Sequence, residues 1–429
     1  MKIGFISLGC AKNQVDSEYL MGLFENPHFE IETDPLKCEA ILINTCGFIQ
    51  SAKEEAINTI LEMAELKNNK LKYLIVTGCL VQRYIEDLKV ELPEVDLFMT
   101  IKDYPKASEL LSSLFGFKID NGYGKNRHMI SNNYMAYLRI ADGCTNRCSY
   151  CAIPLIRGNC VSLPIEKIVE EAKRLYSLGV KELNIIAQDT TYYGKDLYDS
   201  YELKNLIKEL DKIDFKWIRI LYMYPDEIED ELLEVMKNSK HVLPYFDIPV
   251  QYGNDRILKL MNRRGTVSHI KERINKIRDM FEDAYIRTTM IVGFPNEDDN
   301  TFSDTLNFVE DVQFDSLGAF TYSKEEDTKA YEMDNEVPEE LMKERLDILM
   351  RKQKEIVTKK LQAKIGNTYE VLIENESGNI YKGRSYMSAP DGVDSYIYVN
   401  SSEKLEIGSF YQVKIKDYVD YDLIGELIK

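Results

Sequence analysis

The sequence has little of what marks membrane, secreted or fibrous proteins. It contains no apolar run of about 18 residues, the length that a transmembrane helix needs. With 22 Gly and 12 Pro in 429 residues, a collagen-like or low-complexity chain is excluded. Eight cysteines are too few for a disulfide-rich scaffold, and the first residues, MKIGFISLGC, have too short an apolar stretch for a signal peptide. We therefore expect a cytoplasmic protein with reduced cysteines and no membrane segment.

Basic residues are also in deficit. The chain has 54 Lys and Arg against 72 Asp and Glu, a net charge of −18. This charge repels nucleic acid in general, so RNA binding would need a local basic patch. The hydrophobic fraction of 44% is nevertheless sufficient for a sizeable core, and the length predicts about three domains.

The first 120 residues alternate between apolar runs and helical patterns. The runs Ile3–Leu8, Ala40–Thr45 and Tyr73–Thr77 predict strands, with helices over Asp16–Phe24 and Ser51–Leu66. This alternation is typical of a small parallel α/β sheet. The polar stretch 120–133 then indicates a linker.

The alternation continues in a second expected domain, residues 134–364. Six strand-helix units in series favour an open (βα)6 barrel over a flat doubly wound sheet. The charged helix Pro338–Lys364 is expected to be a solvated linker helix. Short alternating runs in residues 365–429 predict a small β-barrel as the third domain. The six predicted strands are Ala136–Ile140, Glu182–Ala187, Trp217–Leu221, Tyr245–Ile248, Ile286–Val292 and Ser316–Thr321.

The strongest motif is a CxxxCxxC run formed by Cys144, Cys148 and Cys151, directly after a predicted strand. Three thiolates this close can bind three irons of a 4Fe-4S cubane and leave the fourth iron open for another ligand. The alternative is a structural zinc site or three unrelated thiols. Zinc sites usually pair two CxxC-like units, and no His lies nearby, so the cluster is favoured.

A second set of cysteines follows three strands of the first domain. Cys10, Cys46 and Cys79 each lie just after a strand, where the ligands of parallel sheets gather. They therefore predict a second three-cysteine cluster site, but three buried core cysteines fit the spacing equally well. Cys38 and Cys160 fit neither set and are interpreted as structural.

Several motifs together resemble the methylthiotransferase family of the radical S-adenosylmethionine (SAM) superfamily. The N-terminal segments GCAKNQVDSE and NTCGFI, the central ADGCTNRCSYCAIPLIRG, AQDTTYYG and YSKEEDTKA, and the C-terminal GRSYMSAP carry the resemblance, which covers essentially the whole chain. Within the family they look most like the enzymes that modify an aspartate of ribosomal protein S-twelve. The third domain is similar to TRAM domains.

The resemblance implies an enzyme with two 4Fe-4S clusters and SAM as cofactors. Cys144, Cys148 and Cys151 would hold the cluster that cleaves SAM to a 5′-deoxyadenosyl radical. Cys10, Cys46 and Cys79 would hold an auxiliary cluster that presents the methylthio sulfur. It also implies that Tyr150 lies against the adenine and that Gln188 and Asp189 stand where the superfamily places groups for the amino end of SAM. The usual Gly-Gly-Glu is absent there.

The resemblance leaves a protein or a transfer RNA as the methylthiolated target. Residues 365–429 contain eleven acidic and six basic residues, a surface better suited to a basic partner than to phosphates. We therefore favour the basic ribosomal protein S-twelve as substrate, with RNA binding weak or secondary, and expect a separate reductant protein and sulfur donor. A non-enzymatic iron–sulfur electron carrier is a third hypothesis, but it explains neither six βα units nor an open cluster iron.

Overall fold

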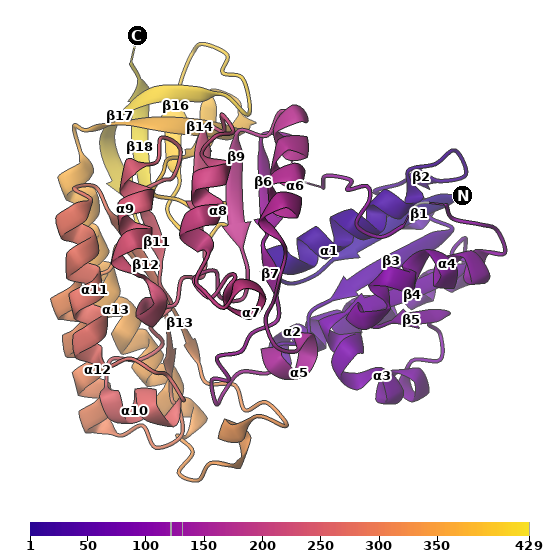
Figure 1. The fold of residues 1–429 in the computed structure, drawn as a ribbon, viewed down its shortest axis with the longest axis horizontal. Coiled ribbons are helices and arrows are strands. Elements are labelled where there is room, and N and C mark those ends of the chain that lie inside the picture. The colour runs from indigo at the N-terminus through magenta and orange to yellow at the C-terminus, as the bar shows by residue number, and fades with distance from the viewer. Residues whose placement is uncertain (121, 131, 429) are drawn as a thin grey trace.

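Three groups of secondary structure follow one another along the chain in the computed structural model, which describes residues 1–120, 122–130 and 132–428 (Figure 1). An N-terminal α/β layer packs against a central set of strands and helices, and a small β-barrel covers one end of the centre. Asn121 and Ser131 of the expected linker, and Lys429 at the end of the third expected domain, lie outside the described residues. No helix of the described part is long and apolar enough to cross a membrane.

The N-terminal group is a five-stranded parallel sheet in the order β2-β1-β3-β4-β5. Three of its strands match the predicted ones, whereas β2 and β5 have only two and three residues, too few to show a pattern. The order changes direction between β1 and β3, and ligands of such sheets bind beyond the carboxyl ends of strands at this point. The strands are β1 (Lys2–Ser7), β2 (Glu30–Ile31), β3 (Ala40–Thr45), β4 (Tyr73–Gly78) and β5 (Leu97–Met99), with helices α1 (Ala11–Met21), α2 (Gln50–Glu65), α3 (Cys79–Glu91) and α4 (Ala107–Phe115).

Helix α1 starts five residues before the predicted start at Asp16. Its first turns bury polar side chains, among them Lys12, Asn13 and Asp16, so apolar periodicity could not reveal them. These buried polar groups lie at the carboxyl end of β1, where the first cysteine of the chain also lies.

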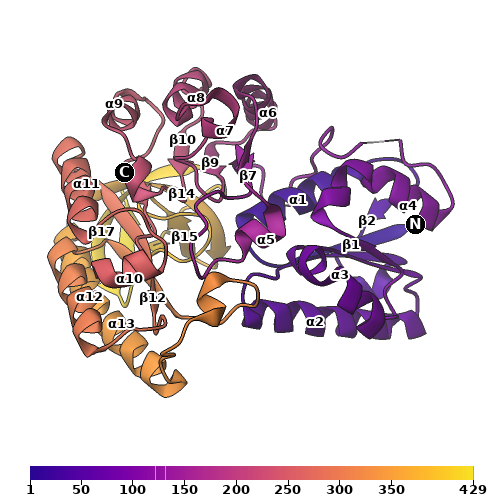
Figure 2. The same cartoon turned by 60° about the horizontal axis from the view of Figure 1, so that its bottom comes forward.

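The central group is the expected open barrel of six parallel strands. Its two halves, β10-β9-β6 and β11-β12-β13, join where Ile218 N–H donates to His241 O at 2.7 Å and Leu243 N–H donates to Ile218 O at 2.9 Å. Strands β6 and β13 are therefore the outer strands, and the N-terminal sheet lies at the open side between them (Figure 2). The strands are β6 (Met135–Arg139), β9 (Glu182–Ile186), β10 (Trp217–Ile220), β11 (Tyr245–Asp247), β12 (Tyr285–Val292) and β13 (Ser316–Thr321), with the short pair β7 (Ala141–Asp142) and β8 (Val161–Ser162).

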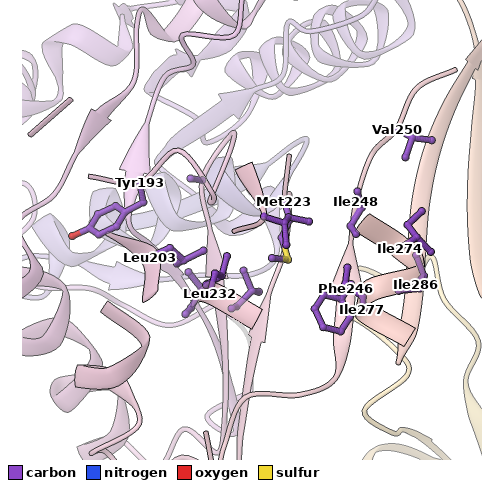
Figure 3. Packing of buried hydrophobic residues seen from close by; sticks show 14 of the residues in the cluster. Tyr193, Leu203, Met223, Leu232, Phe246, Ile248, Val250, Ile274, Ile277 and Ile286 are labelled. Carbon is purple, nitrogen blue, oxygen red and sulfur yellow. The ribbon is translucent and has the colours of Figure 1, made fainter. Parts of the chain in front are cut away.

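Helices cover the outside of these strands and form the main core with them. Figure 3 shows part of this buried cluster, with Leu203, Leu232 and Met223 in one group, and Phe246, Ile277, Ile286 and Ile274 in another. The helices are α5 (Ile153–Arg157), α6 (Ile165–Ser177), α7 (Lys195–Tyr198), α8 (Leu203–Leu210), α9 (Asp230–Asn238), α10 (Asp255–Leu260), α11 (Val267–Met280), α12 (Asp299–Val312) and α13 (Glu339–Lys364).

The interpretation of Pro338–Lys364 as a solvated linker helix is wrong. Helix α13 packs on β13 and α12, and buries Leu349 and Leu361. Its buried Arg345 pairs with Glu297 at 2.8 Å, a carboxylate that is itself inaccessible to solvent. The helix therefore covers the sixth strand. Most of its charged residues lie on the outer face, and an apolar stripe packs against the barrel.

The C-terminal group is a closed five-stranded barrel, as predicted, in the order β14-β15-β16-β18-β17. It docks on the amino ends of the central strands, because Arg384 of β15 donates to both carboxylate oxygens of Glu182, the first residue of β9. Both side chains are fully buried. The carboxyl ends of the central strands lie at the opposite edge, where the segment after β13 contacts α2 and α3 of the N-terminal sheet. The strands are β14 (Thr368–Ser377), β15 (Ile380–Arg384), β16 (Ile397–Asn400), β17 (Phe410–Val419) and β18 (Asp422–Leu427).

Candidate functional site

The first cysteine trio lies along one edge of the N-terminal sheet. Cys10 precedes α1, Cys46 follows β3 directly, and Cys79 is the first residue of α3 after β4. Strands β1, β3 and β4 are neighbours in the sheet, so their carboxyl ends bring the three cysteines to adjacent positions.

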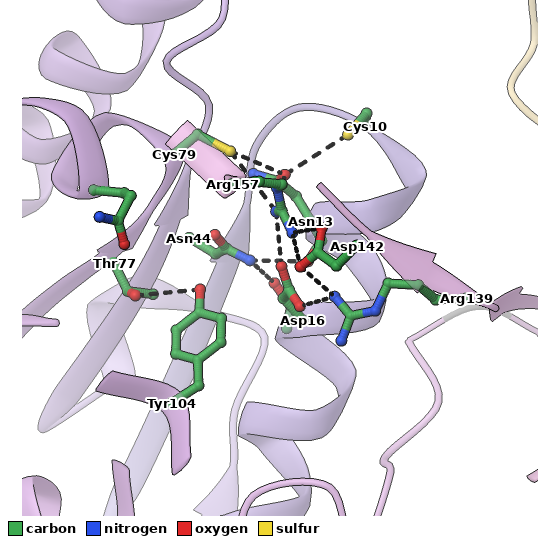
Figure 4. A network of polar contacts seen from close by, with 12 residues as sticks. Cys10, Asn13, Asp16, Asn44, Thr77, Cys79, Tyr104, Arg139, Asp142 and Arg157 are labelled. Atoms are coloured by element: carbon green, nitrogen blue, oxygen red, sulfur yellow. Dashed lines mark hydrogen bonds and ion pairs between the residues drawn. The ribbon is translucent and has the colours of Figure 1, made fainter. Parts of the chain in front are cut away.

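One buried amide connects this trio. Asn13 Oδ1 accepts hydrogen bonds from Cys10 Sγ and Cys79 Sγ, each at 3.7 Å, while Asn13 Nδ2 donates to Thr45 O at 2.9 Å (Figure 4). Gly9, at a φ of +96°, lets Cys46 approach, since a Cβ there would lie 2.9 Å from Cys46 Cβ. The three thiols therefore share one small surface rather than separate places in the core.

Burial raises the pKa of the Cys46 thiol, and it raises the pKa of Cys79 to about 12. The neighbouring thiols of the trio contribute to both shifts. Thiols in such surroundings bind as thiolates only when a cation offsets the desolvation, which iron does. The donor set and its chemistry fit a cluster whose irons are each ligated by one cysteine.

The second trio lies in the loop that leads from β7 to α5. Cys151 N–H donates to Cys148 O at 3.1 Å, a tight turn, and Cys144 N–H donates to Gly158 O at 3.1 Å. Burial raises the pKa of Cys144 to about 12 and that of Cys151 further. Arg263 Nη1 donates to Cys148 Sγ at 3.9 Å and places a positive charge beside this thiol.

Within the described residues, no three His, Cys, Asp or Glu side chains are close enough to ligate a single metal ion. The ligands of a cubane lie on different irons, so they are spaced more widely than those of one ion.

Both trios lie near the junction of the N-terminal sheet and the barrel. Cys79 belongs to one small buried cluster with Ala152, which follows Cys151, and Ile156 of α5. The cysteines that the sequence separated into two motifs thus belong to one region, built from two parts of the chain.

Arg157, the last residue of α5, connects the two sides (Figure 4). Its guanidinium pairs with Asp142 at 3.0 Å and with Asp16 at 2.8 Å, and it donates to Cys79 Sγ at 3.7 Å. Arg139 forms a further ion pair with Asp16. Burial opposes ionisation of Asp142, but the two arginines outweigh it and hold its pKa below the usual range.

A cavity of about 310 Å³ opens between the N-terminal sheet and the barrel. It is lined by Phe48 and Ile49, which follow Cys46, and on the barrel side by Tyr150, Gln251 and other residues of β12 and β13. The Tyr150 ring also packs edge-on against Phe294, with centroids 6.5 Å apart. The structure therefore places Tyr150 at a cavity large enough for part of a cofactor or substrate.

Gln188 and Asp189 point to different neighbours. Gln188 Nε2 donates to Asp142 Oδ1 at 3.0 Å, and its buried Oε1 has no hydrogen-bond partner among the described residues. Asp189 Oδ2 accepts a hydrogen bond from Asn146 Nδ2 at 2.6 Å. The neighbouring carboxyl group of Glu227 has a pKa raised to about 8, first by burial and then by the negative charge of Asp189. Gln188 Oε1 is therefore an unused acceptor beside Asp142, among the described residues.

Lys12 is a buried cation at the same junction. Its ammonium lies 3.2 Å from the centroid of the Tyr222 ring, which follows β10. Burial lowers the pKa of Lys12 to about 8, so the side chain stays mostly charged at pH 7.

A second set of ion pairs closes the domain junction beside the cavity, which Glu325 also lines. The Glu325 carboxylate, 2% exposed, pairs with Lys53 of α2 and Arg83 of α3, each at 3.0 Å. Arg83 also donates to Glu326 O at 2.6 Å. Glu325 lies in the segment YSKEEDTKA after β13, so this motif fastens the N-terminal sheet to the barrel.

The sequence interpretation missed several residues of the site, among them Asn13, Asp16 and Arg157. All three lay inside motifs that were identified for their cysteines, GCAKNQVDSE and CAIPLIRG. Cys38 and Cys160 are buried and belong to neither predicted set. Cys38 packs among α2 and β4 residues, whereas Cys160 lies in the barrel core, where its N–H donates to Oγ1 of Thr145, the residue after Cys144, at 3.1 Å.

Three family models match successive parts of the chain. They are the Uncharacterized protein family UPF0004 over residues 2–100, the Radical SAM superfamily over 138–309 and the TRAM domain over 365–428. Among solved structures, the radical S-adenosylmethionine methyltransferase TsrM from Kitasatospora setae covers 75% of this chain and 74% of its own at a TM-score of 0.57 and 11% identity. The radical enzyme OxsB covers 83% of this chain and 56% of its own at a TM-score of 0.51 and 13% identity. Both share the fold.

Curated relatives are far more similar and span the whole chain. The ribosomal protein uS12 methylthiotransferase RimO of Alkaliphilus oremlandii is 48% identical, covering 100% of this chain and 99% of its own. The protein of the same name from Clostridioides difficile is 46% identical with the same coverages. The chain therefore belongs to the RimO family of ribosomal protein uS12 methylthiotransferases, within the radical SAM superfamily.

Proposed function

We propose that the protein adds a methylthio group to the β-carbon of an aspartate in ribosomal protein uS12, with SAM and two 4Fe-4S clusters as cofactors. The observation that supports this proposal is that the two parts of the chain that carry the cysteine trios pack together, with Cys79 and Ala152 in one buried cluster. A single-cluster enzyme would need only the CxxxCxxC loop. A second cysteine trio in the adjoining N-terminal sheet supports a second cluster with a separate role in the reaction.

In this proposal Cys144, Cys148 and Cys151 hold the SAM-binding cluster, and Cys10, Cys46 and Cys79 hold the auxiliary one. When bound, the cofactors supply an electron for SAM cleavage, a radical that removes a hydrogen atom from an unactivated carbon, and the sulfur.

The remaining residues position the cofactor and the two cysteine loops, and they exclude water. Tyr150 closes one side of the cavity against the cofactor, and Gln188 presents its unpartnered oxygen as an acceptor. Arg157 holds the two cysteine loops together through Asp16 and Asp142. The ion pairs of Glu325 keep the N-terminal sheet closed over the barrel mouth.

We further propose a division into three domains, residues 1–120, 134–364 and 365–429. The segment between the first two domains also holds them together. Its buried Arg127 pairs with Glu18 of α1 at 2.6 Å and with Glu171 of α6 at 3.2 Å. A cytoplasmic reductant protein and a sulfur donor complete the proposed reaction.

The alternative target is transfer RNA. The net charge of −18 and the acidic excess in residues 365–429 favour a basic protein, because phosphates would be repelled. The names of the curated relatives also support a ribosomal protein.

The test is mass spectrometry after anaerobic reconstitution with iron, sulfide, reductant and SAM. Ribosomal protein uS12 and bulk transfer RNA are offered in parallel. The proposal expects one methylthio group on an aspartate of uS12 and none on RNA. The same group on RNA alone would reject the protein target, and absence of SAM binding would favour the electron-carrier alternative.

A further inference from the structure

Lys12 combines deep burial with the lack of a counter-ion. Its residue is 7% exposed, and among the described residues no carboxylate lies within the 4.0 Å of an ion pair. An ammonium without a partner in such surroundings is costly, since burial removes its hydration. Its contact with the Tyr222 ring offsets only part of that cost.

The carboxylates near Lys12 are engaged elsewhere. Asp142 accepts from Arg157 and Gln188. Asp247 Oδ2 accepts from Tyr222 N–H at 2.9 Å, and its Oδ1 faces Arg287 at 3.5 Å. These two carboxylates thus have other partners, and neither forms an ion pair with Lys12.

Tyr222, whose ring contacts the Lys12 ammonium, has a strained backbone conformation. Tyr222 has a φ of +61°, which a bulky residue rarely adopts. Three hydrogen bonds hold its backbone: Tyr222 N–H donates to Asp247 Oδ2, and Tyr222 O accepts from Thr190 N–H at 3.0 Å and from Thr190 Oγ1 at 3.2 Å. Strain that surrounding contacts maintain is typical of functional sites. Here the strained backbone holds the Tyr222 ring against the Lys12 ammonium.

The position of Lys12 suits a substrate group. It lies two residues after Cys10 of the first trio, and its ammonium contacts the Tyr222 ring on the barrel side. A carboxylate bound to Lys12 would therefore lie at the junction of the N-terminal sheet and the barrel, next to the first proposed cluster. In an aspartate the β-carbon is bonded directly to the carboxyl carbon, so a fixed carboxylate also fixes the reacting carbon.

We propose that Lys12 binds the side-chain carboxylate of the substrate aspartate and so determines that an aspartate is modified. This inference rests on the proposed function and names the residue that selects its substrate. Lys12 is a specificity residue and takes no part in SAM cleavage. A charge-assisted hydrogen bond at a buried site corresponds to a difference in affinity of about 10- to 100-fold.

The test is equilibrium binding of ribosomal protein uS12, with its target aspartate or with asparagine in that place, to the reconstituted holoprotein in the presence of SAM. The wild type is expected to prefer the aspartate form by about 10- to 100-fold. Lys12→Met, which keeps the apolar stem, should bind both forms equally, while Lys12→Arg retains a preference. The matched control is Lys360→Met, because Lys360 of α13 pairs with Asp315 at 2.7 Å, remote from the cysteines.

Each outcome separates this inference from the proposed function. If the wild type methylthiolates uS12 but binds both forms equally, or if Lys12→Met keeps the preference, the inference is wrong and the function stands. If Lys12→Met instead changes the electron paramagnetic resonance signal of the auxiliary cluster and leaves the preference intact, Lys12 serves the cluster. If the wild type neither binds nor modifies uS12, the proposed function fails and the inference fails with it.

Discussion

Arg157→Met is the substitution that tests the junction of the two cysteine trios most severely. The guanidinium is 2% exposed and carries the ion pairs to Asp16 and Asp142 together with the contact to Cys79. Removing one partner of a buried ion pair costs about 3–5 kcal/mol. Asp16 keeps Arg139, and Asp142 is 31% exposed, so we expect the lower end of that range, about 3 kcal/mol.

The readout must be local, because a chain of several domains does not unfold in one step. A loss of about 3 kcal/mol in docking corresponds to about 100-fold faster hydrogen exchange where the junction opens, in α1 and α5. SAM cleavage should persist, since the CxxxCxxC loop keeps its own backbone contacts. The ratio of methylthiolated uS12 to cleaved SAM should fall, because the auxiliary trio loses its fixed position.

The matched control is Arg127→Met. Arg127 also forms buried ion pairs across the junction, with Glu18 and Glu171, but it contacts neither trio. It should accelerate exchange in α1 to a similar degree while the product ratio stays at the wild-type value. Equal product ratios in the two variants would refute the role assigned to Arg157, and unchanged exchange in Arg157→Met would refute the energetic argument.

Three further predictions follow from the same contacts. Cys148→Ala should abolish SAM cleavage, whereas Cys46→Ala should spare cleavage and stop sulfur insertion; methylthiolation by Cys46→Ala would contradict the auxiliary assignment. Although burial opposes ionisation, hydrogen bonds hold the pKa of Glu325 below its usual value, so its contribution to domain docking is complete above about pH 4.5 and is lost as the pH falls through the lowered pKa. Glu325→Gln should remove this acid dependence in small-angle scattering, and an unchanged profile would reject it. Cys38→Ala should leave the iron content at the wild-type value, and a loss of iron would place Cys38 in a cluster site.

Much of the fold was predictable because its strands carry strong local signals. The runs that became β1, β3 and β4 are continuous and apolar, since both faces of a parallel sheet are covered. Their carboxyl ends also located the cysteines Cys10, Cys46 and Cys79 on one edge. The edge strands β2 and β5 gave no signal because two or three residues cannot show a period.

What the sequence could not supply is the pairing of distant polar residues. Lys12 and Asn13 lie before the predicted helix start at Asp16, and no pattern in the sequence indicates that both are buried. The sequence also assigned no role to Arg157. Its role appears only when α5 meets α3 and brings it to Cys79, a contact between residues 78 positions apart. Tertiary contact of this kind leaves no periodic trace in a single sequence.

The measurement that tests the central claim most directly is iron quantification with Mössbauer spectroscopy on three reconstituted proteins. These are the wild type, the triple variant Cys10→Ala/Cys46→Ala/Cys79→Ala and the triple variant Cys144→Ala/Cys148→Ala/Cys151→Ala. Two independent cubane sites predict about eight irons per chain in the wild type and about four in each variant, all as 4Fe-4S clusters. A first variant that retains about eight irons, or a wild type that binds only about four, would contradict the two-cluster account.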